Sequence, residues 1–255
     1  MALQGQSLGE LLDSMTVPGD LYQVVDADSA KIRCLACAHR CVIRDGQRGV
    51  CKVRLNRGGV LYVPRNYAAS VQVDPIEKKP FFHVLPGTAA FSFGMLGCDF
   101  RCDFCQNWLT SQALRDDAAG LAPQPVTARE LIAAARRSGS KSVASTYNEP
   151  LITAEWAVEI FKLARQAGMR TLFVSNGHAS PEVLEYLAPW LDGYKIDLKS
   201  MRDATYRRVC GGRLQPVLDT IRRAYELGMW VEVVTLVVPD MNDSSEELWE
   251  AAHYI

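Results

Sequence analysis

Short runs of apolar residues alternate with amphipathic segments along the chain from about residue 90 onward. The apolar runs, which are typical of buried strands, cover residues 90–96, 142–147, 171–175, 194–198 and 230–238. Each run precedes a segment with a helical repeat of apolar positions, and these segments begin near residues 127, 153, 180, 216 and 244. Five β–α units in succession predict an α/β fold, a partial parallel β/α (TIM-like) barrel with its helices outside.

Local capping signals mark the ends of several of these predicted helices. Thr127 is followed three residues later by Glu130, which is the spacing of a capping box. Ser180 stands before a proline, as an N-cap residue does when proline takes the first helical position. Gly168 and Gly228 lie where two helices are expected to end.

The first part of the chain does not follow this alternation. Residues 1–88 hold short extended stretches, such as 60–63, and glycine-rich turns, such as 56–59. We expect a small N-terminal cysteine-rich module there, packed on a barrel that covers residues 89–255. The alternation stops after the fifth unit, with residue 255 inside a predicted helix. The expectation is therefore a barrel truncated after its fifth β/α unit, with its C-terminal part missing and the edge of its last strand open.

Composition and charge narrow the classes of function. The 255 residues carry 28 basic and 29 acidic side chains, a net charge of −1, which argues against nucleic acid as a partner. No apolar run approaches the roughly 18 residues that span a bilayer, and the N-terminus lacks the basic and apolar regions of a signal peptide. A cytoplasmic protein without a membrane partner is expected. Its eight cysteines are then reduced, so their grouping indicates metal ligation rather than disulfides.

Three of the cysteines, Cys98, Cys102 and Cys105, open an unusually long connection after the first predicted strand. Connections longer than about 12–15 residues are usually functional or disordered. Three thiolates in this spacing can hold three irons of a [4Fe–4S] cluster and leave the fourth iron open. That iron can bind S-adenosylmethionine (SAM) through its amino and carboxylate groups, and one electron then converts SAM to a 5′-deoxyadenosyl radical. The alternatives are a zinc knuckle that takes a ligand from elsewhere and a chance group of core cysteines.

A second group comprises Cys34, Cys37, Cys41 and Cys51. Four thiolates close a metal site, so this group predicts either structural zinc or an auxiliary iron–sulfur cluster that transfers electrons. Zinc is the preferred interpretation, because small modules need such a staple. The eighth cysteine, Cys210, stands alone beside two glycines and is interpreted as a buried bystander rather than a reactive thiol.

The first of these groups resembles a known signature. Cys98-x3-Cys102-x-Phe104-Cys105 is similar to the motif of radical SAM enzymes, with Phe104 in the aromatic position. The resemblance implies that Glu149, after the second strand, meets the SAM amino group. It also implies SAM contacts after the next two strands, made by Asn176, Asp197 and Lys199. In the segment before Glu149, this chain has Tyr147-Asn148 where the family carries two glycines.

Other segments narrow the resemblance. Residues 197–203 and 237–239 are similar to pyruvate formate-lyase activating enzyme, which activates a glycyl radical enzyme. The four-cysteine group, together with segments 74–80 and 210–213, resembles the radical SAM enzymes of the AmmeMemoRadiSam system.

The predicted function is that of a radical SAM oxidoreductase, in which a [4Fe–4S] cluster cleaves SAM reductively and the radical abstracts hydrogen from a substrate. The resemblance implies a one-electron donor such as flavodoxin or ferredoxin. The substrate is a protein or a small molecule, and for an activase of a glycyl radical enzyme it would be a backbone glycine of a protein. The alternative from a different class is a metal-binding scaffold that binds partners without catalysis. Formation of 5′-deoxyadenosine by an anaerobic sample with dithionite and SAM distinguishes the two.

Overall fold

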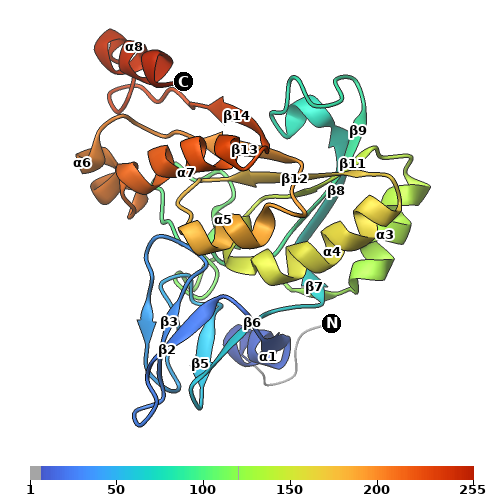
Figure 1. The fold of residues 1–255 in the computed structure, drawn as a ribbon, viewed down its shortest axis with the longest axis vertical. Helices are drawn as coiled ribbons and strands as arrows, with labels where there is room; N and C mark the ends of the chain where they lie inside the picture. Colours follow the sequence, from blue (N-terminus) through green and yellow to red (C-terminus); the bar gives the residue numbers. More distant parts are fainter. Residues whose placement is uncertain (1–6, 120) are drawn as a thin grey trace.

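A six-stranded sheet forms the centre of the computed structural model, which describes residues 7–119 and 121–255 (Figure 1). In spatial order the strands are β14 (Trp230–Val234), β13 (Gly193–Asp197), β12 (Arg170–Ser175), β11 (Ser142–Ser145), β9 (Ala89–Gly94) and β8 (Ser70–Pro75). The first five are parallel, whereas β8 pairs with β9 antiparallel. The fold is therefore α/β with a mostly parallel central sheet, as the sequence predicts.

The five parallel strands lie within the predicted apolar runs or one residue beyond them, and they are neighbours in chain order. Their register places Ser145 of β11 between Phe93 of β9 and Phe173 of β12. Phe173 lies opposite Tyr194 of β13. Because parallel strands in register end at the same edge, the loops that follow them meet at one end of the sheet.

Four helices cover one face of this sheet: α3 (Ala128–Arg137), α4 (Ala154–Gln166), α5 (Pro181–Leu187) and α7 (Leu214–Glu226) (Figure 1). Aromatic side chains fill the layer between helices and sheet. Trp156 of α4 packs edge-on against Phe93, and Phe161 of the same helix packs against Phe173. All four rings are buried, so this layer is the main core between the helices and the central sheet.

The predicted helix starts are present. Thr127 and Glu130 form the expected capping box, and Ser180 Oγ accepts a hydrogen bond from the Val183 amide at 3.2 Å. The last helix, α8 (Ser245–Tyr254), is capped by Ser244. Shorter helical turns are α2 (Trp108–Ser111), α6 (Asp203–Thr205), η1 (Ile76–Lys78), η2 (Pro150–Thr153) and η3 (Tyr206–Cys210). Within the described ranges, every helix is too short or too polar to cross a membrane.

The N-terminal part consists of one helix and short antiparallel strands, drawn in blue and cyan in Figure 1. Its elements are α1 (Leu8–Ser14), β1 (Thr16–Pro18), β2 (Tyr22–Asp26), β3 (Lys31–Cys34), β4 (Val42–Ile43), β5 (Leu55–Arg57) and β6 (Val60–Pro64). They form two sheets, in the orders β1-β6-β5 and β2-β3-β4, and β7 (Tyr67–Ala68) pairs with β10 (Gln124–Pro125). A buried ion pair between Arg54 and Glu155 of α4, with Nη2 and Oε1 2.6 Å apart, joins this part to the barrel.

The boundary expected at residue 88 does not coincide with an edge of the central sheet. Strand β8 belongs to the residues that the sequence assigns to the N-terminal module, yet it pairs with β9 along its whole length. Most of its residues are exposed, because it is an edge strand. It therefore lacks the continuous apolar run by which buried parallel strands are identified in a sequence.

Candidate active site

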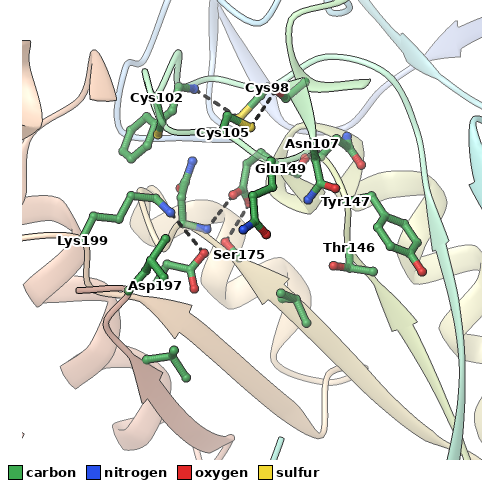
Figure 2. A pocket seen from close by; sticks show the side chains of 18 of the residues that line it. Cys98, Cys102, Cys105, Asn107, Thr146, Tyr147, Glu149, Ser175, Asp197 and Lys199 are labelled. Atoms are coloured by element: carbon green, nitrogen blue, oxygen red, sulfur yellow. Dashed lines mark hydrogen bonds and ion pairs between the residues drawn. The ribbon is translucent and has the colours of Figure 1, made fainter. Parts of the chain in front are cut away.

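A cavity of about 320 Å³ opens at the carboxyl ends of the parallel strands. All the residues predicted to hold the SAM-cleaving cluster or SAM line it: Cys98, Cys102, Phe104, Cys105, Glu149, Asn176, Asp197 and Lys199. Figure 2 shows the three cysteines on one side of the cavity, with Asp197 and Lys199 on another and Glu149 between them. Pockets for small molecules usually measure roughly 300–1,000 Å³, so the cavity is of a suitable size for a cofactor.

The three cysteines lie on the loop between β9 and α2, and their side chains are half-buried. The Phe100 amide lies 3.4 Å from Cys98 Sγ and donates to it. Cys105 Sγ lies 3.2 Å from the Ser111 hydroxyl of α2. The start of the long connection singled out in the sequence thus presents its thiols to the cavity.

Phe100 anchors this loop to the barrel. Its buried ring packs against His178 and Tyr206, with centroid distances of 5.0 and 6.1 Å. A Cβ atom added to Gly212 would lie 2.1 Å from Phe100 Cε1. Glycine is therefore required where segment 210–213 passes beneath the cysteine loop, which explains the pair of glycines noticed in the sequence.

Cys210 is fully buried beneath the same loop. Its carbonyl accepts a hydrogen bond from the Arg101 amide at 2.8 Å. A hydrogen bond between its thiol and that of Cys102 lowers the pKa of Cys210. The residue expected to be a buried bystander is therefore buried, in direct contact with one of the three loop cysteines.

Glu149 follows β11, and hydrogen-bond donors of the protein surround its buried carboxylate. Oε1 accepts from the Leu151 amide at 2.9 Å and from the Ser175 hydroxyl at 2.7 Å. Oε2 accepts from the Asn176 amide at 2.8 Å. Burial and, after it, the charge of Asp99 together raise the pKa of Glu149 to about 8, against these hydrogen bonds, which lower it. A hydrogen-bond donor or a cation in the cavity would favour the ionised form and lower that pKa.

The side chain of Asn176 is engaged by the protein itself. Its Nδ2 donates to Asp99 Oδ1 at 2.7 Å, and its Oδ1 accepts from the His178 amide at 2.8 Å. The other oxygen of Asp99 lies 3.2 Å from His178 Nδ1. Because Asp99 follows Cys98 directly, Asn176 positions the cysteine loop as well as lining the cavity.

Tyr147 stands where the family carries a glycine, and its backbone keeps a glycine-like conformation. Its φ of +71° lies in the left-handed region that residues with a side chain rarely adopt. The phenol is held at both sides, because its Oη lies 2.8 Å from Lys79 Nζ and 2.8 Å from Ser92 Oγ. Lys79 in turn pairs with Asp74 at 2.7 Å. Segment 74–80 thus stabilises the turn that leads to Glu149. The left-handed backbone of Tyr147 costs about 1–3 kcal/mol of strain.

A cluster of charges lies at the end of β13. Lys195 and Lys199 both contact the Asp197 carboxylate, the latter with Nζ and Oδ2 3.2 Å apart. The Lys199 ammonium also lies over the ring of Phe104, 5.7 Å from its centroid. Lys195 is buried and lines the cavity, but the sequence analysis omits it. The strand periodicity could have identified Lys195, because residues two apart in a strand share a face and Asp197 lies two residues further on.

The N-terminal cysteines come together in three dimensions. Cys34, Cys37 and Cys51 are buried and Cys41 is half-buried. The Cys34 amide donates to the Cys41 carbonyl at 2.9 Å, and the Val50 amide lies 3.4 Å from Cys41 Sγ. Burial raises the pKa of Cys37, and the other three thiols add to that rise. The group is therefore a real cluster of thiols, which lies outside the cavity.

Comparison with known proteins identifies the family. Residues 94–255 match the radical SAM superfamily, and this segment is more than half of the chain, so the chain belongs to that superfamily. It is a radical SAM enzyme similar to pyruvate formate-lyase activating enzymes. It is 26% identical to the one from Clostridium pasteurianum over 166 residues, which are 62% of this chain and 66% of that enzyme.

Two further relatives extend the likeness toward the N-terminus. The uncharacterized protein MJ0808 of Methanocaldococcus jannaschii is 38% identical over 229 residues, which are 89% of this chain and 67% of that protein. A radical SAM methyltransferase from Sphaerobacter thermophilus superposes with a TM-score of 0.52 at 15% identity, over 94% of this chain and 63% of that one. At that identity the second likeness concerns the fold alone.

Membership of the superfamily implies a [4Fe–4S] cluster and SAM, and the thiols of the loop fit such a cluster. Among the described residues, the only three or more His, Cys, Asp or Glu side chains with ligand atoms all within 4.8 Å of one another are His39, Asp99 and His178. The thiols of Cys98, Cys102 and Cys105 therefore do not all lie as close together as ligands of one ion. A cluster, in which each thiolate binds a different iron, does not require that closeness.

Proposed function

We propose that Cys98, Cys102 and Cys105 bind a [4Fe–4S] cluster beside a SAM molecule that occupies the cavity. The proposal rests on the position of three thiols on a single loop, where they face a cavity. The buried carboxylate of Glu149 and the side chains of Lys195 and Lys199 also line this cavity. When bound by these thiols, such a cluster would supply the one electron needed to cleave SAM at its C5′–S bond to methionine and a 5′-deoxyadenosyl radical, and that radical would abstract hydrogen from a substrate.

The protein residues bind and orient SAM in this proposal. Glu149 has an acceptor position left on Oε2, which suits the amino group of SAM. Asp197 offers acceptors for hydroxyl groups, and Lys199 offers a positive charge for a carboxylate. Asn176 acts mainly through Asp99, as a positioning residue. Phe104 supports Lys199 from the side of the cysteine loop.

The proposed reaction class is hydrogen abstraction of the activating-enzyme type, with an external one-electron donor and a protein as substrate. The relatives named as pyruvate formate-lyase activating enzymes support it. An activating enzyme must admit an extended segment of its target, and the cavity is open to the outside beside Phe104 and Leu236.

Anaerobic reconstitution with iron and sulfide tests the proposal. The wild-type chain should form 5′-deoxyadenosine from SAM in the presence of dithionite. The variant Cys98→Ala/Cys102→Ala/Cys105→Ala should form none and should bind about four irons fewer per chain. Equal iron content in the two proteins would refute the assignment of the cluster to this loop.

A further inference from the structure

We propose that Cys34, Cys37, Cys41 and Cys51 bind a second iron–sulfur cluster, and that this cluster lies directly beside the cysteine loop of the SAM site. That the second cluster lies beside another cluster rests on the proposed function, because the first cluster is the one proposed for Cys98, Cys102 and Cys105. The metal content of the N-terminal site does not depend on it. The sequence alone favours zinc in these four cysteines. The spacing of the sulfurs favours iron and sulfide, and the contacts of the Cys51 backbone place the site beside the SAM loop.

The spacing of the sulfur atoms carries the first step. Four thiolates bound to one zinc at about 2.3 Å in a tetrahedron lie about 3.8 Å from one another. Within the described part of the chain, no three of the four N-terminal thiols lie within 4.8 Å of one another. The cysteines of the SAM loop, which belong to a family that binds [4Fe–4S], have the same property. Neither group therefore has the mutual closeness of ligands to one zinc ion, and a cluster in which each thiolate binds its own iron does not require that closeness.

The burial of the four cysteines agrees with a cluster. Three are buried and the fourth is half-buried. The backbone amide of Val50 already points at Cys41 Sγ, at 3.4 Å. Hydrogen bonds from amides to ligand sulfurs and exclusion of solvent are the means by which a protein sets the reduction potential of an iron–sulfur cluster.

Contacts between the two cysteine segments carry the second step. One nitrogen of the Arg115 guanidinium, Nη2, donates to the carbonyls of both Val50 and Cys98, at 2.6 and 2.7 Å. Val50 precedes Cys51, so a single nitrogen joins the segments that carry a ligand of each site. A Cβ atom added to Gly97 would lie 2.9 Å from the Cys51 carbonyl oxygen, so these two backbones are in contact.

A part-buried polar contact joins the two groups at a second place. His39, two residues after Cys37, lies with Nε2 3.2 Å from the Asp99 carbonyl, and Asp99 follows Cys98. The His39 ring also packs edge-on against His178, with 4.7 Å between centroids. The two cysteine groups are thus connected twice. Val50, next to Cys51, is bridged to Cys98 by Arg115, and His39, close to Cys37, contacts Asp99, next to Cys98.

This arrangement suits electron transfer. The second cluster would accept one electron from an external one-electron donor and pass one electron to the neighbouring cluster, with no bond made or broken. A structural zinc ion has no redox chemistry, so it would not use the short distance between the two sites.

Metal analysis of three proteins tests the proposal: the wild type, the variant Cys98→Ala/Cys102→Ala/Cys105→Ala, and Cys37→Ser. Each is reconstituted anaerobically with iron and sulfide in the presence of equimolar zinc. The triple variant keeps the N-terminal cysteines, so it should retain about four irons, four sulfides and no zinc per chain. Adding Cys210→Ser to the triple variant, as a matched control outside both groups, should leave that iron in place. Wild type should bind about twice as much iron, and Cys37→Ser about half of the wild-type amount.

Spectroscopy then tests the proximity of the two sites. After reduction, the electron paramagnetic resonance spectrum of wild type should show broadening from two interacting spins, and neither variant should show it. One zinc and no iron in the triple variant would overturn the proposal, and so would no bound metal. Failure of the proposed function would differ, because wild type and the triple variant would then carry the same iron, all of it lost in Cys37→Ser.

Discussion

Replacement of Glu149 by Gln separates the binding role of this residue from its structural role. The amide keeps the shape of the side chain and one oxygen, which can still accept from Leu151 and Ser175. Its NH2 group then faces the Asn176 amide, so that one buried donor loses its acceptor. The expected loss in the free energy of unfolding is about 1–3 kcal/mol.

The same substitution should weaken SAM binding. A charge-assisted hydrogen bond is roughly twice as strong as a neutral one. Loss of the charge should therefore remove about 1.5 kcal/mol, which is about a tenfold rise in Kd. Titration calorimetry of the anaerobically reconstituted protein with SAM measures this change, and chemical denaturation measures the change in stability.

Glu232→Gln is the matched control for this experiment. Glu232 is also buried, and it accepts hydrogen bonds from the amides of Phe82 and His83 and from the Trp230 indole, but these contacts lie away from the cavity. Its replacement should cost similar stability and leave the Kd for SAM unchanged. If Glu149→Gln binds SAM as tightly as wild type, or if both variants lose affinity equally, the reasoning about Glu149 is wrong.

Glu149 should also make the stability of the cofactor-free protein depend on pH. Its pKa is about 8 in the folded chain against 4.5 for an unperturbed glutamate, so the folded state binds more protons between these values. Stability linked to this group is fully present below pH 4.5 and is lost as the pH rises toward 8. Glu149→Gln should flatten that decline in denaturation experiments at several pH values. An equally steep decline in the variant would contradict the assigned pKa.

Three further outcomes are expected. Cys102→Ala should abolish both the cluster absorbance and SAM cleavage after reconstitution, and a full cleavage rate would contradict the central assignment. Gly212→Ala places a Cβ 2.1 Å from an aromatic carbon of the cysteine loop and should cost about 1–3 kcal/mol in denaturation and lower the bound iron. Gly9→Ala, whose Cβ meets nothing closer than 3.8 Å in helix α1, should lower neither stability nor bound iron. Arg54→Met leaves the carboxylate of Glu155 buried without its partner and should lower the free energy of unfolding by about 3–5 kcal/mol; a loss below 1 kcal/mol would show that the pair does not join the two parts of the chain.

The residues of the cavity divide into those that the sequence identifies and those that it does not. The three loop cysteines were found by their spacing, and Glu149, Asp197 and Lys199 by the resemblance to radical SAM enzymes. All of them lie at or just after the end of a predicted strand. Lys195 lies inside a strand and was passed over, although its side chain shares a face with Asp197. The Asn176 side chain was assigned to SAM, but the structure places its amide on Asp99. A side chain's partners depend on neighbours that lie far away in the sequence.

The sequence by itself determined the parallel strands, the helix caps and the spacing of the cysteines, because hydrophobic period, capping and ligand spacing act over a few residues. The tertiary structure decided which segments and side chains contact one another. Strand β8 joins the sheet although its exposed edge leaves little hydrophobic signal. Tyr147 adopts a glycine-like backbone conformation because Lys79 and Ser92 hold its phenol. The Cys51 and Cys98 segments meet on one guanidinium nitrogen. Such contacts depend on how the whole chain packs, and no local pattern encodes them.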